Sequence, residues 1–331
     1  MRQPLPRFKA PRTAPAGRWR RVPPAIFPPL LGLMGLALAW RAGVRDFALP
    51  PALAEFMAGV VLALFACAVV AYGAKLTRRP AVLAEDLAIL PGRAGVGAGV
   101  LCLYLAVGLL HPFVPFIGRA ALVVAILLHL AMLAVLLPVM LSAPPEQRRV
   151  TPVWHLNFVG FIVAARVALV LDWPELARLL FWPTALAALV IWGLSLRQLL
   201  AERVPAPLRP MLAIHLAPVA LLGTVAAGLG MDTIGWLAGA VSGLVVLAAL
   251  AGARWLLAAG FSAMWGAMTF PLAATAGLWS ALAVMSGAEW VRLVAGLLLV
   301  AATLFVVPVF ARIWKMWAQG GLAVKTNAAI A

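Results

Sequence analysis

Residues 261–280 read FSAMWGAMTFPLAATAGLWS, a stretch without a single charged residue. Pro271 interrupts it, Phe270 stands directly before the proline, and alanine, threonine and glycine follow. A proline removes one backbone hydrogen bond and bends a helix, and within a bilayer the freed carbonyl must find a partner in protein or water. The stretch therefore predicts a kinked, buried helix that carries one large ring on a face of small residues.

The composition of the whole chain indicates what surrounds this helix. Of the 331 residues, 65% are hydrophobic and 11% are charged, and the mean hydropathy is +1.05. Soluble domains are about half apolar and about a quarter charged, so we interpret the chain as an integral membrane protein with several spans. Its two cysteines lie inside apolar segments, and neither they nor the four histidines have metal-site spacing. We expect no metal and no cofactor.

Segments long enough to span a bilayer follow one another along most of the chain. A spanning helix needs about 20 apolar residues. Ten stretches meet this requirement: 24–41, 51–74, 88–109, 118–141, 153–171, 176–199, 208–229, 232–257, 259–283 and 287–312. The sequence therefore predicts an all-α transmembrane domain of ten helices over 24–315. It is flanked by a basic, proline-rich, disordered tail over 1–23 and a C-terminal tail over 316–331.

The distribution of basic residues predicts the orientation of these spans. The net charge is +16, but the basic residues lie in short tracts between apolar blocks, which favours membrane topology over nucleic-acid binding. With both termini on one side, 20 basic residues lie on that side, five lie on the other, and Arg166 lies within a span. The positive-inside rule therefore predicts that both termini are cytoplasmic.

The odd-numbered segments form an internal repeat that the even-numbered segments do not share. Four of the five odd segments carry a proline inside or at the start of the span, and small residues recur on one helical face. The even segments are rich in leucine and valine, as expected for helices that face lipid. The four prolines expected to kink the odd helices are Pro28, Pro91, Pro218 and Pro271.

Two arrangements explain a small-residue face. Glycines and alanines spaced by four residues allow close packing of neighbouring helices, which is the commoner explanation for any one helix. Five such helices alternating with five more apolar ones favour a different arrangement. In it, five helical hairpins surround a central pore, with the kinked helices inside and the others shielding them from lipid.

Four stretches carry a resemblance to a known family. They are AIFPPLLGLMGLALAW (25–40), TPVWHLNFVGFIVAA (151–165), LRPMLAIHLAPVALLGT (208–224) and FSAMWGAMTFPLAA (261–274). In order and spacing they resemble the tellurite-resistance/dicarboxylate transporter family. That family includes a bacterial tellurite-resistance membrane protein, the plant slow anion channel, and fungal malate and sulfite transporters. The resemblance covers about residues 24–315.

The resemblance implies five hairpins with quasi-fivefold symmetry, a homotrimer with one pore per subunit, and a phenylalanine ring that closes the pore. The gate maps onto Phe270. Phe261 is a second candidate, although its place at a segment start favours an interfacial role, and Phe27 is a less direct neighbour of the pore. The fifth segment departs from the family pattern, because Phe161 stands where relatives often have a glycine–proline pair.

The residues expected to line the pore combine these faces with the resemblance. They are Phe27, Gly32, Gly95, Gly99, Asn157, Gly160, Phe161, His215, Thr224, Phe261, Gly266, Ala273 and Gly277. Arg166 is expected to avoid the small-residue face, since it lies about 180° from Asn157 on a helical projection. Both a snorkelling role and a functional role remain open for it. His215 either lines the pore or is a hydrogen-bonded core histidine.

These observations favour an anion channel in the inner membrane of a bacterium, with small inorganic or organic anions and the lipid bilayer as its partners. The alternative is a proton-coupled transporter or exporter of C4-dicarboxylate, sulfite or tellurite-related anions. Coupling needs a buried titratable group in the pathway, and His215 is the one reasonable candidate. An enzyme is not expected, because the sequence has no catalytic triad, CxxC, phosphate loop or acid cluster.

Overall fold

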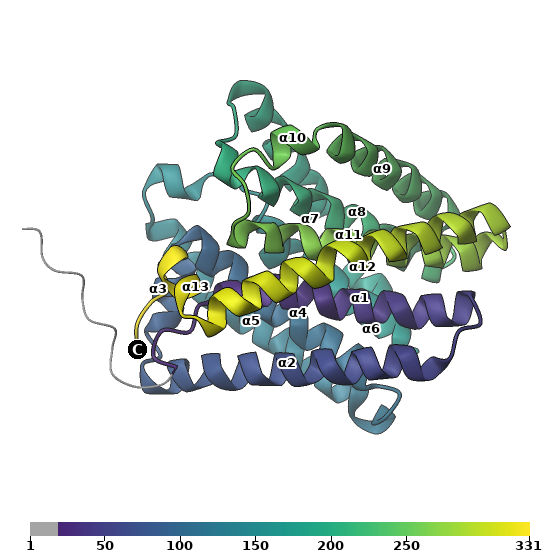
Figure 1. Ribbon diagram of the computed structural model, residues 1–331, viewed down its shortest axis with the longest axis horizontal. Coiled ribbons are helices and arrows are strands. Elements are labelled where there is room, and N and C mark those ends of the chain that lie inside the picture. Colours follow the sequence, from purple (N-terminus) through teal and green to yellow (C-terminus); the bar gives the residue numbers. More distant parts are fainter. Residues whose placement is uncertain (1–18) are drawn as a thin grey trace, which may run out of the picture.

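The computed structural model describes residues 19–331, apart from the side chains of residues 146 and 147, and every regular element in this part is helical (Figure 1). Most of the predicted tail over 1–23 lies outside the described residues. The helices are α1 (Phe27–Asp46), α2 (Pro51–Arg78), α3 (Val82–Ala88), α4 (Leu90–Leu110), α5 (Gly118–Ser142), α6 (Phe161–Val170), α7 (Pro174–Ala201), α8 (Leu216–Gly228), α9 (Asp232–Ala251), α10 (Ala253–Leu256), α11 (Gly266–Ser286), α12 (Glu289–Ala318) and α13 (Gly321–Lys325).

Nine stretches within residues 19–331 are helical, long and apolar enough to cross a membrane. They correspond to α1, α2, α4, α5, α7, α8 with the turn before it, α9, α11 and α12. They match nine of the ten predicted spans. The segment expected over 153–171 is a shorter apolar stretch, His155–Val170, in which a π turn precedes α6. The chain thus bends at this point by a π turn rather than by a proline.

Four of the odd-numbered segments enter their helix through an irregular turn. The turns are Pro24–Ile26 before α1, His155–Val159 before α6, Ala206–His215 before α8 and Ala263–Trp265 before α11. Two further 3-10 turns, Pro115–Ile117 and Pro145–Arg148, lie outside these segments. The entry turns thus occur in four of the five odd segments, but the even helix α5 also begins after one, and α4 does not.

Only one of the four prolines expected to kink a helix lies in a helix interior. Pro28, Pro91 and Pro218 stand in the first turns of α1, α4 and α8, where the missing N–H has no helical partner in any case. Pro271 lies inside α11. Among the inner helices, the bend that a proline forces on a helix is therefore confined to α11. The outer helices α5, α7 and α12 carry interior prolines at Pro138, Pro183 and Pro308.

Burial separates the long helices into two classes that alternate along the chain. In the four odd spans, between 61% and 78% of the central residues are buried, against 22% to 33% in the five even spans. The residues of α6 are also mostly buried. The even helices expose leucine, valine and phenylalanine side chains, as expected for surfaces that face lipid. The predicted division into inner and outer helices matches this burial.

The contacts between helices close into a cycle. Among the inner helices, α1 packs against α4, α4 against α6, α6 against α8, α8 against α11, and α11 against α1 again. Each inner helix also packs against the outer helix that follows it in the chain. That outer helix in turn reaches the next inner helix: α2 reaches α4, α5 reaches α6, α7 reaches α8, α9 reaches α11, and α12 reaches α1.

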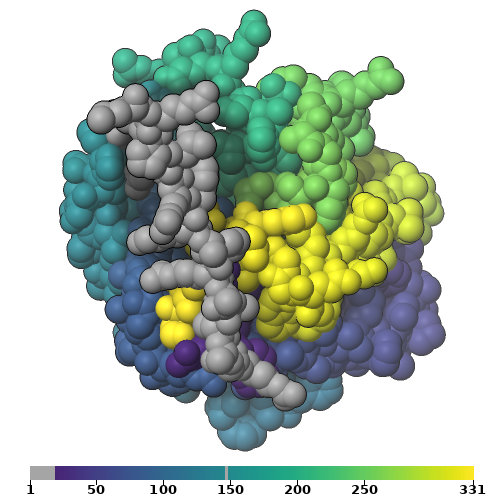
Figure 2. Space-filling model, turned by 60° about the vertical axis from the view of Figure 1, so that its left-hand side comes forward, coloured from purple at the N-terminus to yellow at the C-terminus, as the bar shows by residue number. Residues whose placement is uncertain are grey.

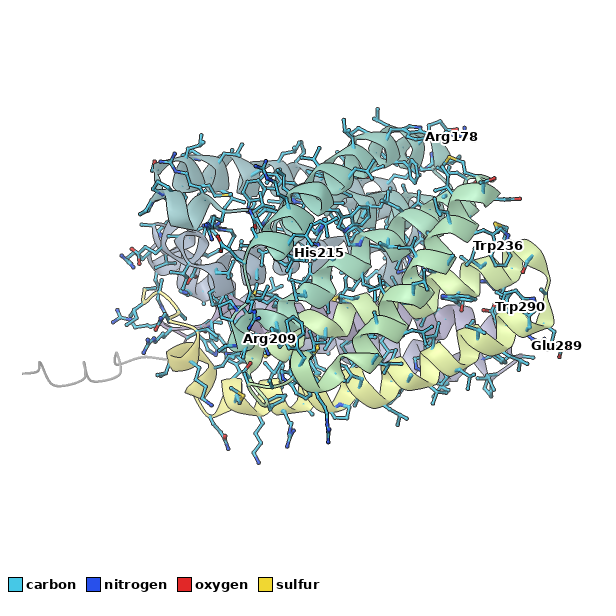
Figure 3. The ribbon with its side chains drawn as sticks, turned by 90° about the horizontal axis from the view of Figure 1, so that it is seen from above. Arg178, Arg209, His215, Trp236, Glu289 and Trp290 are labelled. Carbon is cyan, nitrogen blue, oxygen red and sulfur yellow. The ribbon has the colours of Figure 1, made fainter. Side chains whose placement is uncertain are left out.

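The two described ends of the chain meet at one end of this bundle. The backbone N–H of Ala331 donates to the carbonyl of Arg20 (2.9 Å), and Nε of Arg21 donates to the carbonyl of Ala328 (3.3 Å). Figure 2 shows the C-terminal segment, in yellow, on this end of the molecule. In Figure 3, Arg209 lies in the half nearer this end, whereas Arg178 lies at the opposite end.

Candidate functional site

A small cavity lies where the five inner segments begin. Its volume is about 40 Å³, room for only a few water molecules. Every side chain around it is apolar. The lining residues are Ala25, Pro28, Leu31, Pro91, Ala94, Ala98, Leu156, Met211, Ile214, Ala217, Met264, Gly266, Ala267, Phe270 and Pro271. Because each of the five inner segments contributes, the cavity lies at the common interior of the cycle of contacts.

Phe270 is the largest side chain on this cavity. It is 4% exposed, and its ring lies against α1, where a Cβ built on Gly35 would be 2.9 Å from ring atom Cδ2. The hydroxyl of the preceding residue, Thr269, donates to the carbonyl of Gly266 (2.7 Å) and lies 3.3 Å from that of Pro28. These contacts fix the start of α11 against α1, while the ring itself borders open space.

The side chains expected on the pore-facing surface of α11 follow one stripe. Gly266 and Phe270 lie on the cavity. Ala273, one turn farther, is fully buried near Gly35, and Gly277 faces the guanidinium of Arg166. Of the face expected on α11, Gly266 and Phe270 thus border the cavity, whereas Ala273 packs against α1 and Gly277 faces α6.

The remaining glycines in the set expected to line the pore lie in contacts between helices. A Cβ on Gly32 would collide with Thr269, one on Gly95 with the backbone of Pro24, and one on Gly99 would touch the ring of Phe27. A Cβ on Gly160 would meet Leu101 and His129. These positions fit the close-packing explanation of the small-residue faces.

The three other phenylalanines of the set lie away from the cavity. Phe27 packs edge-on against Phe65 and Tyr72 of α2, with ring centroids 6.4 and 5.7 Å apart. Phe161 stacks on His129 at 4.1 Å. Phe261 contacts Trp265 and lies 4.9 Å from the guanidinium carbon of Arg312, which agrees with an interfacial position.

The polar candidates lie in local hydrogen bonds. Asn157 is buried, and Nδ2 of its side chain donates to the carbonyl of Val153 (3.2 Å). The hydroxyl of Thr224 donates to the carbonyl of Ala220 in its own helix (2.8 Å). Neither side chain lies on the cavity.

His215 forms a pair with a second histidine. Its Nδ1 lies 2.9 Å from Nε2 of His155, and Trp192 donates to its backbone carbonyl (3.2 Å). Nδ1 of His155 and Nε2 of His215 are buried without a partner in the described chain. The pair lies beside a wider groove of about 320 Å³ that includes Arg149, Glu202 and His215. Met211 lines both this groove and the apolar cavity.

Sequence reasoning missed most of the cavity wall. On α4 the wall is formed by Pro91, Ala94 and Ala98, one residue before the glycine face that was expected there. On the seventh segment it is formed by Met211, Ile214 and Ala217. The available signal was the spacing of three or four residues on each segment, shifted from the glycines toward alanine and methionine.

The close approach of Phe270 to α1 leads to a first prediction. The change Gly35→Ala is expected to destabilise the protein by about 1–3 kcal/mol, the usual cost of overpacking, because its Cβ would press on the ring of Phe270. The same change should cost little when residue 270 is alanine. Thermal unfolding of the four proteins of this double-mutant cycle measures the coupling. If Gly35→Ala lowered the stability equally with phenylalanine and with alanine at position 270, the ring of Phe270 would not lie against Gly35.

Comparison with known proteins identifies the family to which the chain belongs. No curated protein matches the chain. A family model described as voltage-dependent anion channel, SLAC1, matches residues 21–314 and confirms the resemblance seen in the four sequence stretches. The match extends from before α1 into α12 and so includes all five inner segments. The chain therefore belongs to the SLAC1 family of voltage-dependent anion channels, whose members are channels or transporters rather than enzymes.

Proposed function

We propose that the chain is an anion channel whose pore runs through the middle of the cycle of inner helices and is closed by Phe270. The observation that carries this proposal is the position of Phe270 on a cavity to which all five inner segments contribute. The family match supplies the class of substrate. The closed cycle of contacts and the alternation of buried and exposed helices support five hairpins related by quasi-fivefold symmetry.

Helix dipoles explain how an apolar cavity attracts anions. The inner helices begin at the cavity, so their N-terminal ends converge on it. Each helix N-terminus is equivalent to about +0.5 elementary charge. The potential in the cavity is therefore positive although no lining side chain is charged. A field of this kind lets an anion enter without the tight binding that would prevent its release.

The ring of Phe270 acts as a steric and dewetting barrier in this proposal. A cavity of about 40 Å³ with apolar walls does not hold a hydrated anion, and hydrophobic constrictions stop conduction by excluding water. Opening requires the ring to swing away from Gly35, or α11 to shift at Pro271, where one backbone hydrogen bond is missing. Small anions with a low dehydration cost would pass most readily.

The proposal includes an orientation and an assembly. The excess of basic residues on the side of both termini favours a cytoplasmic location for the end of the bundle where the cavity lies. We propose the inner membrane of a bacterium as the location and a homotrimer as the assembled state. Exposed apolar side chains on the outer helices serve both lipid contact and contact between subunits.

One observation favours the second candidate function, proton-coupled anion transport. His155, which is buried, and His215, which is partly buried, form a pair in which each ring keeps one nitrogen without a partner in the described chain. A pair of this kind beside the pathway offers a site for a transported proton. The channel remains the first choice, because the histidine pair does not line the apolar cavity.

Flux measurements in liposomes separate the two functions. For a channel, nitrate flux should follow the nitrate gradient and the membrane potential, and a proton ionophore at fixed potential should leave it unchanged. The variant His215→Gln, which keeps a hydrogen-bonding group, should conduct within about twofold of the parent, since His215 does not line the apolar cavity. Flux that needs a proton gradient and is lost in His215→Gln would establish the transporter instead.

A further inference from the structure

Arg166 extends across the interior of the bundle rather than along its own helix. It belongs to α6, and its guanidinium lies against α11, where a Cβ built on Gly277 would be 3.1 Å from Nη2. In the cycle of inner helices, α8 separates α6 from α11. A side chain that reaches from α6 to α11 must therefore cross the space that the five inner helices surround. Asn157 and Gly160, on the small-residue face of the same segment, instead lie against α4 and α5, so Arg166 lies off that face, as the helical projection indicated.

The guanidinium has no partner in the described chain. No hydrogen bond or ion pair joins Arg166 to another described residue, and its Nη1 is buried without an acceptor. The residue as a whole is only partly buried. A charge in a membrane interior without a partner is costly. The structure therefore carries this cost, because the described chain supplies no counter-charge for the guanidinium.

The stripe on α11 places Arg166 relative to the gate. Gly277 lies seven residues after Phe270, which corresponds to about 10 Å along the helix. The apolar cavity lies at the starts of the inner helices, so Arg166 lies beyond Phe270 on the opposite side. The cavity before the ring thus has no charged lining residue, whereas one fixed positive charge lies beyond the ring.

We propose that Arg166 binds a small inorganic anion on the side of the pore beyond Phe270, and that it selects anions over cations there. This inference rests on the proposed channel function. The open donors of the guanidinium form a planar fork that fits a planar oxyanion such as nitrate better than a spherical ion. A bound anion removes the cost of the unpaired charge. Rings of arginine or lysine serve as selectivity elements in anion pores, and here a single arginine supplies the charge.

Binding is tested without any transport step. The purified protein is unfolded thermally at constant ionic strength while nitrate replaces gluconate. Nitrate is expected to raise the midpoint of the parent with saturation, as a ligand of the folded state does. The same rise is expected for the matched control Arg178→Gln, which removes an exposed arginine at the end of the molecule beyond Phe270, on outer helix α7 (Figure 3).

Arg166→Gln should respond about tenfold more weakly to nitrate, as expected when a charge-assisted hydrogen bond is lost. Without nitrate it should be at least as stable as the parent, because an unpaired charge has been removed. If Arg166 only stabilised the fold, Arg166→Gln would be less stable than the parent without nitrate. Arg166→Lys, which keeps the charge but not the fork, should retain binding with less preference for nitrate over chloride. The inference is overturned if nitrate does not raise the unfolding midpoint of the parent, or if it raises the midpoint of Arg166→Gln as much as that of the parent.

Flux measurements distinguish failure of this site from failure of the channel. In liposomes, the nitrate-to-potassium permeability ratio of Arg166→Gln should fall several-fold while that of Arg178→Gln stays unchanged. If all variants lack anion flux, the proposed channel function fails. If anion flux is present and the permeability ratio of Arg166→Gln equals that of the parent, the channel stands and the arginine site fails.

Discussion

Replacing Phe270 by alanine is expected to raise anion flux in reconstituted liposomes by roughly tenfold or more, since a hydrophobic constriction blocks conduction by excluding water. The change removes the largest side chain on the cavity and leaves the other lining residues in place. In the proposed channel the ring lies between the apolar cavity and Arg166, so its loss should open the way from one to the other. The measurement is nitrate or chloride efflux at fixed potential, normalised to the amount of folded protein.

A matched control distinguishes a gate from a core residue. Phe181 is 2% exposed on outer helix α7 and does not line the apolar cavity. Phe181→Ala should lose about 3–5 kcal/mol of stability, as is usual for a truncated core phenylalanine, without a gain in flux. Phe270→Ala should lose less, because its ring borders a space that already exists. Unchanged flux in well-folded Phe270→Ala would remove the gate from the proposal.

The sequence was sufficient to predict the classes of helix. Hydropathy located nine spans, and the contrast between small-residue and leucine-rich segments separated buried helices from exposed ones. Both signals are properties of a whole segment, so they survive errors of a few residues. The fifth segment was harder, because a π turn at His155–Val159 shortens its α-helix. No proline marks this turn in the sequence.

The orientation of single side chains could not be predicted in the same way. An error of one residue rotates a helical face by about 100°, which explains why Gly95 was expected where Ala94 lies. Arg166 shows a second limit. A helical projection indicates which face of its own helix a residue occupies, but not which other helix its side chain meets. Contacts across the interior, such as that between Arg166 and Gly277, depend on how far two helices are shifted along their axes relative to each other. A single sequence gives no information on this shift.

Replacing Asp86 by alanine is expected to cost about 3–5 kcal/mol of stability, the usual effect of removing one member of a buried ion pair. Asp86 accepts hydrogen bonds from Lys75 (2.6 Å) and Tyr72 (3.0 Å), and both members of the ion pair with Lys75 are fully buried. Lys75 also donates to the carbonyl of Val22, and the N–H of Ala329 donates to Asp86. The network therefore joins α2, α3 and both described ends of the chain.

The adjacent pair Arg79–Glu85 provides the control, since its atoms are also 2.6 Å apart but its side chains are 42% and 48% exposed. Glu85→Ala should change stability by about 0.5 kcal/mol or less, because water screens an exposed pair. The double change Lys75→Met with Asp86→Leu should recover part of the loss by removing the uncompensated charge. Recovery stays incomplete because Ala329 and Tyr72 still lose an acceptor. Thermal unfolding in detergent tests this order, and similar losses for Asp86→Ala and Glu85→Ala would show that burial does not decide the strength of the pair.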